Sequence, residues 1–155
     1  MEIILEISKT DVMDEVGRVT AYYGTASGDG APGYDTAAAT PDDQELLNVY
    51  WSGAKDDLFR IAQRFEPADI SGTIKNSRTS ERYEDYTLRL EMPSSWDTEG
   101  TERLRNAMRL YAIHDITAKW AVRAIPSAAE GIAALSTADV SAISQLLHHT
   151  LRPTE

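Results

Sequence analysis

The first residues of the chain alternate between apolar and polar side chains. Ile3, Leu5 and Ile7 fall on one face, and Glu2, Ile4 and Glu6 fall on the other. Alternation with a period of two is typical of a strand with one buried face. The pattern therefore predicts a short N-terminal strand.

Helical spacing follows the strand. The segment Ser8–Asp11 places an acid three residues after a hydroxyl, as a capping box does. Apolar residues from Val12 to Tyr23 then recur every three or four positions, and Gly24 is a natural helix end. We expect a first helix over about 9–23, followed by a flexible glycine-rich loop at 24–40 with four glycines.

A second helix is predicted to start at Thr40-Pro41-Asp42-Asp43. Thr40 can cap it, Pro41 suits the first helical position, and Asp43 completes a capping box. From Leu47 to Phe65 the apolar residues form one broad stripe, and Pro67 ends it. Ser52 and Lys55 spell S-x-x-K, but we interpret them as polar positions beside this stripe.

The period changes again after Pro67. Ile70 to Ile74 is a possible strand, and Tyr86 to Met92 alternates apolar and polar residues. The charged segment 75–85 between them has the composition of an exposed turn. These features predict an extended β-hairpin.

Two more helices complete the prediction. Asp97 or Thr98 can cap a long helix that runs to about 124 and ends before Pro126. Ser136–Asp139 offers a further cap, for a last helix from Val140 to Leu151. We therefore expect one α+β domain over 1–155, mainly α-helical. It has about four helices, a short N-terminal strand and the hairpin between the second and third main helices.

Charge narrows the classes of partner. The chain has 155 residues, a net charge of −10 and no cysteine. Residues 1–50 carry ten acids and two bases, a net charge of −8, whereas residues 101–155 carry five acids and six bases, a net charge of +1. Phosphate backbones attract basic surfaces, so we expect no direct sequence-specific binding of nucleic acid. No apolar run has the length of a membrane span, and we expect synthesis in the cytoplasm.

Candidate chemistry is sparse. Residues 28–33 match G-x-G-x-x-G, but a helix precedes them and Pro32 removes an amide that a pyrophosphate needs. His114-Asp115 and His148-His149 are adjacent pairs, which diverge by about 100° on a helix and do not converge on one ligand. We therefore expect no catalytic residue, no cofactor and no metal. Two alternatives stay open: a small carboxylate-dependent hydrolase using acids from 81–85 and 97–102, and an acidic regulatory or inhibitor protein.

Several segments in order resemble an uncharacterised family of phage and prophage structural proteins from Bacteroides-type gut bacteria. They are ISKTDVMDEVGRVTAYYG, GYDTAAATPDDQELLNVYW, YEDYTLRLEMP, AIHDITAKWAVRAIP and LLHHTLRPT. The resemblance implies a non-enzymatic virion protein, similar to a head–tail connector or a tail component. Its partners are then further copies of itself, arranged in a ring, and neighbouring virion proteins.

On this interpretation the contact surfaces are the 24–40 loop, the 75–85 tip and the C-terminal end. The residues that we expect there are Tyr34, Lys75, Arg78, Arg82, Glu84, His148 and Arg152.

Overall fold

The computed structural model describes residues 2–26, 39, 43–65 and 85–149. The elements are β1 (Glu2–Ile7), α1 (Lys9–Ala26), α3 (Gln44–Ala62), a 3-10 turn (Gln63–Phe65), β2 (Tyr86–Glu91), α4 (Glu99–Ala124) and α5 (Pro126–His149). This arrangement confirms the predicted α+β fold, which is mainly helical and has a small antiparallel sheet.

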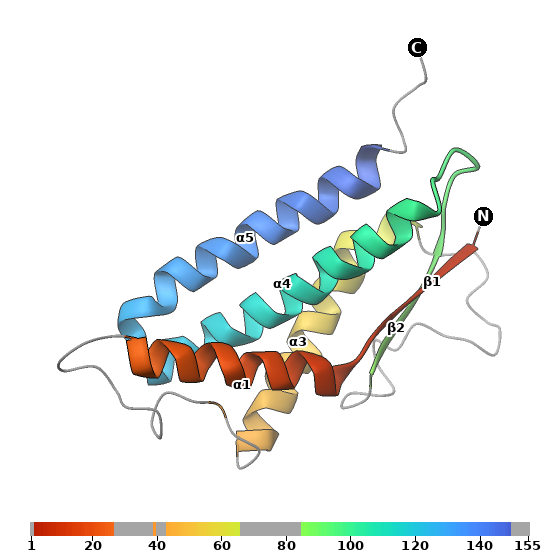
Figure 1. The fold of residues 1–155 in the computed structure, drawn as a ribbon. Helices are drawn as coiled ribbons and strands as arrows, with labels where there is room; N and C mark the ends of the chain where they lie inside the picture. The colour runs from red at the N-terminus through yellow and green to blue at the C-terminus, as the bar shows by residue number, and fades with distance from the viewer. Residues whose placement is uncertain (1, 27–38, 40–42, 66–84, 150–155) are drawn as a thin grey trace.

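Helix α4 is the centre of the molecule. It contacts α1, α3, α5 and β1, and α5 runs along one side of it (Figure 1). The apolar positions that the sequence placed on α4 are buried, among them Leu104, Met108, Ile116 and Trp120. Val122 is an exception at 65% exposed, so this end of the predicted stripe faces outward.

The sheet consists of β1 paired antiparallel with β2. Leu5 lies opposite Leu88, and Ile3 lies opposite Leu90. These four side chains are buried, which confirms the predicted alternation in both strands. The other predicted arm of the hairpin, 70–74, and its tip up to Glu84 lie outside the described residues.

Side chains from two segments cap the start of α1. The Ser8 hydroxyl accepts the Asp11 N–H at 3.3 Å, as the predicted capping box requires. The Asp85 carboxylate accepts the Lys9 N–H at 2.8 Å, which ties the helix to the residue before β2. The prediction that Gly24 ends this helix is wrong, because α1 continues to Ala26. Tyr23, in its last turns, packs against a buried cluster of α4 and α5 residues, and this packing favours the longer helix.

Helix α3 buries the predicted stripe. Leu47, Trp51 and Leu58 belong to the main core. The helix begins at Gln44 with Asp43 at its N-cap, whereas the predicted cap at Thr40 and the helix end at Pro67 lie outside the described residues. Lys55 differs from the prediction, since it is fully buried and its Nζ lies 5.8 Å from the centre of the Trp51 ring. A lysine stem packs as an apolar chain, and the ring face attracts the ammonium.

Helix α5 begins at Pro126, ten residues before the predicted cap at Ser136. Pro126 occupies its first position, where a missing N–H is harmless. The hydroxyls of Ser136 and Thr137 both donate to the carbonyl of Ala133 inside the helix, so they do not cap a new one. The prediction that Pro126 ends the long helix is confirmed, because α4 stops at Ala124. The Asp97 carboxylate accepts the Glu99 N–H at the start of α4, as expected of a cap.

Candidate functional site

The predicted contact residues fall mainly on parts of the chain outside the described residues. These are Tyr34, Lys75, Arg78, Arg82, Glu84 and Arg152. His148 lies in the last turn of α5, but its side chain is not among those described. The G-x-G-x-x-G segment at 28–33 is also outside them. These surfaces remain predictions.

Three of the four described carboxylates of the hydrolase alternative have partners within the fold. Asp85 accepts the Lys9 N–H at the start of α1, and Asp97 accepts the Glu99 N–H at the start of α4. Glu102 forms an ion pair with Arg105 one turn further along α4. Asp85 and Asp97 line two different cavities, so these acids are not gathered around one site.

His114 and Asp115 have separate partners, as their divergence on a helix predicts. His114 pairs through Nδ1 with Asp139 of α5, and this contact links the two long helices. Asp115 forms an ion pair with Lys119 at 2.9 Å, one turn along the same helix. The adjacent residues do not form a dyad with each other.

A polar cluster lies where α3 meets α4. The Tyr111 hydroxyl donates to Asp57 at 2.9 Å, and the Asp115–Lys119 pair lies one turn further along α4. A methyl group at Gly53 would lie 3.2 Å from the Lys119 ammonium, so the glycine leaves room for this lysine against α3. Burial raises the pKa of the Asp115 carboxyl, and the lysine offsets part of that rise. Burial, followed by the nearby acids, also raises the pKa of the Tyr111 phenol.

Sequence reasoning missed this cluster. Asp57 and Tyr111 are 54 positions apart, and only the packing of α3 on α4 brings them together. The helical spacing of Tyr111, Asp115 and Lys119 was an available signal, because i,i+4 neighbours share a face. None of these side chains lines the groove between α1 and α3 or the cavities beside Arg109 and beside Ala142. We assign them to the packing of the two helices.

We expect Tyr111→Phe to test that assignment. Losing the hydrogen bond to Asp57 lowers the free energy of unfolding by about 1 kcal/mol near pH 7. Because the folded phenol has a raised pKa, its contribution to stability is complete below the ordinary tyrosine pKa of about 10 and declines as the pH rises above it. Urea unfolding between pH 8 and pH 11 should therefore show a shallower alkaline decline in the variant. An unchanged decline would contradict a buried phenol.

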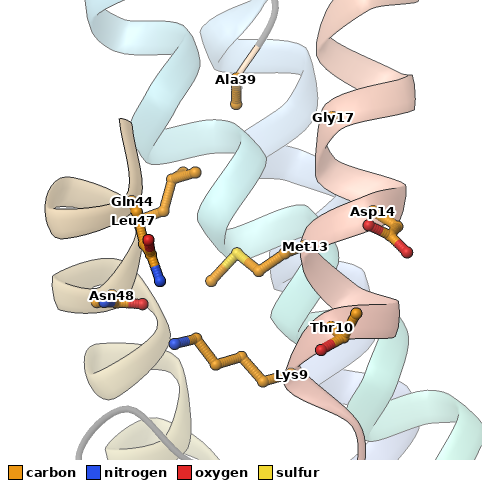
Figure 2. A pocket seen from close by; sticks show the side chains of 9 residues that line it. All are labelled: Lys9, Thr10, Met13, Asp14, Gly17, Ala39, Gln44, Leu47 and Asn48. Carbon is orange, nitrogen blue, oxygen red and sulfur yellow. The ribbon is translucent and has the colours of Figure 1, made fainter. Parts of the chain in front are cut away.

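A groove of about 420 Å³ separates α1 from α3 (Figure 2). Met13 and Leu47 line it from opposite sides, and the Lys9 side chain extends toward Asn48. The Asn48 Oδ1 atom is buried and has no hydrogen-bond partner in the described part of the chain. The groove can hold a small apolar group beside a hydrogen-bond donor. Its lining also includes the charged residues Lys9 and Asp14.

Ala39 borders this groove next to α1. Its N–H donates to the Thr20 hydroxyl at 2.9 Å, and that hydroxyl donates to the carbonyl of Val16 at 2.8 Å. Thr20 is fully buried, and a methyl group at Gly17 would lie 3.3 Å from the Ala39 carbonyl oxygen. Gly17 therefore leaves room for the Ala39 backbone, and Thr20 binds it to α1 by a hydrogen bond.

Two further cavities lie elsewhere on the described part of the chain. One of about 440 Å³ lies beside Arg105 and Arg109, and Arg109 pairs with Asp11 of α1. The hydrogen bond from Arg109 holds the pKa of the Asp11 carboxyl below its usual range. Another, of about 550 Å³, lies between the start of α4 and the end of α5. With each arginine paired to an acid, the first cavity is not an anion site.

The outward side of α5 has an unusual composition. The helix has two acids, Glu130 and Asp139, and no lysine or arginine in 24 residues. Its exposed positions from Pro126 to Leu147 are mainly alanine, serine, threonine and glycine, and Glu130 is the charged residue among them. Leu135 on this side is 45% exposed. A solvated helix face normally carries charged residues, so this side has the composition of a contact surface.

The described residues contain no grouping of three or more histidine or acidic side chains that could hold a metal ion. Among the described helices, none has the length and apolarity to cross a membrane. Comparisons with protein families, curated proteins and solved structures found no match to this chain. The assignment of a functional surface to this chain therefore rests on the structure and the sequence alone.

Proposed function

We propose that this protein is a non-enzymatic, self-associating structural protein of a tailed-phage particle, with its place at the head–tail connector or in the tail. The observation that carries the self-association is the outward side of α5, which is nearly uncharged on a chain with a net charge of −10. The setting in a phage particle comes from the resemblance of its sequence segments to phage structural proteins.

The charge distribution supports this proposal physically. Two copies of an acidic protein repel each other over most of their surfaces. Contact is least opposed where charge is absent, and cores of protein interfaces are depleted of charged side chains. The outward side of α5 meets both conditions. Asp85 and Asp97, in contrast, hold the starts of helices and Glu102 pairs with an arginine, as a structural role allows.

Light scattering on the purified protein tests the self-association. We expect a mass above that of the 17.1 kDa chain at micromolar concentrations, with negative-stain images showing assemblies of uniform size. A monomer at every accessible concentration would contradict the proposal. Detection of the protein in purified phage particles, by mass spectrometry, tests the setting separately.

The segment 75–85 is the second surface in this proposal. Reversing Arg78 and Arg82 to glutamate should leave the melting temperature within a few degrees, because exposed ion pairs contribute about 0–1 kcal/mol each. Assembly should fall, because each contact is repeated in every subunit. Thermal unfolding and light scattering on the same samples separate the two effects. Normal assembly of the folded double variant would place the interface elsewhere.

A further inference from the structure

One flank of α5 has a self-complementary order of large and small residues. Gly131, Leu135, Ala138, Ala142 and Leu146 recur at helical spacing and so share one side of the helix. The first four are exposed, and Leu146 is partly buried. Small residues on such a flank let a second helix approach closely, while each leucine needs a space to fill.

That space exists at the C-terminal half of the same flank. The cavity of about 550 Å³ is lined by Ala142, Gln145 and Leu146 of α5, by Gly100 and Arg103 of α4, and by Trp96 and Asp97 just before α4. The cavity opens beside the small side chain of Ala142, where an apolar group of another molecule can enter. Its position next to Leu146 extends the apolar flank onto α4.

We propose that this flank packs against the same flank of a second copy of the chain, antiparallel and around a two-fold axis. The inference rests on the self-association in the proposed function and names its contact. When the pairing is centred between Ala138 and Asp139, Leu135 of each copy lies opposite Ala142 of the other. Gly131 then lies opposite Leu146. Each leucine meets a small residue, and Leu135 enters the cavity of the second copy.

Sedimentation equilibrium of the full chain tests the contact. Leu135→Glu replaces the apolar side chain at the centre of the contact with a charged one and should weaken the self-association by about tenfold or more. Ile4→Glu is the matched control, because Ile4 is also 45% exposed but lies on β1. The control should associate as the wild type does. Circular dichroism of both variants should show unchanged helical content.

Two results separate this inference from the proposed function. A wild type that remains monomeric overturns both. A wild-type oligomer that Leu135→Glu leaves intact overturns the α5 contact, while the proposed self-association stands. A two-fold contact closes at two subunits, so larger assemblies need a second surface. The segment 75–85 is the proposed one.

Discussion

Replacing Trp51 with alanine should lower the free energy of unfolding by about 3–5 kcal/mol. The Trp51 ring is fully buried and belongs to the main core, together with side chains from both strands and α4. Its removal leaves a cavity that the surrounding elements can only partly fill. The variant also loses the ring that the buried Lys55 ammonium faces. A loss of this size is a large part of the total stability of a small domain, about 5–15 kcal/mol.

Urea unfolding followed by circular dichroism measures this loss, because the removal of one of the three tryptophans changes the fluorescence signal itself. Trp51→Phe is the matched control. A phenyl ring fills part of the same site, so the loss should be clearly smaller than for alanine. A loss below about 1 kcal/mol for Trp51→Ala would mean that the α3 stripe does not face the core.

Local patterns were sufficient to predict the strands and three of the helices. The alternation at Ile3 and Leu5, and again at Leu88 and Leu90, records a sheet with one buried face. Such a pattern can be read from residues that are neighbours in the sequence. The pairing of one strand with another cannot, because the two strands are far apart in the sequence. The antiparallel pairing of Glu2 with Glu91 joins the ends of a long segment, and nothing local encodes it.

The start of α5 shows where a local signal misled. Ser136 and Asp139 have the spacing of a cap, and the residues before them are too small to form an apolar stripe. Alanine is nevertheless the best helix former, and Pro126 is well placed to begin a helix. Ile132 supplies the buried contact of this first half, with Ala121 and Ile125 in the same cluster. The helix propensity of the alanines and the buried contact of Ile132 therefore decide where the helix begins, and the capping pattern at Ser136–Asp139 does not.

The polar contacts between helices could not be predicted from sequence patterns. Tyr111 with Asp57 and His114 with Asp139 join helices that only the tertiary fold brings together. The side of α5 was hidden for a related reason. Its lack of charge becomes informative only after the structure shows that α4 covers the opposite side.

Truncating a side chain to alanine should destabilise the monomer on the inner side of α5 and leave its stability nearly unchanged on the outer side. Ile143 is fully buried, whereas Leu135 is 45% exposed. At concentrations low enough to keep the chain monomeric, Ile143→Ala should lower the free energy of unfolding by about 2–5 kcal/mol. Leu135→Ala should change it by less than about 0.5 kcal/mol, because no core contact is lost.

Urea unfolding of both variants, compared with the wild type at the same concentration, measures this difference. If Leu135→Ala were as destabilising as Ile143→Ala in the monomer, Leu135 would belong to the fold and could not serve a second copy. If neither variant changed the free energy of unfolding, α5 would contribute little to the core, and the packing of α5 on α4 would add little to stability. The expected asymmetry assigns the inner side of the helix to folding and leaves the outer side available for association.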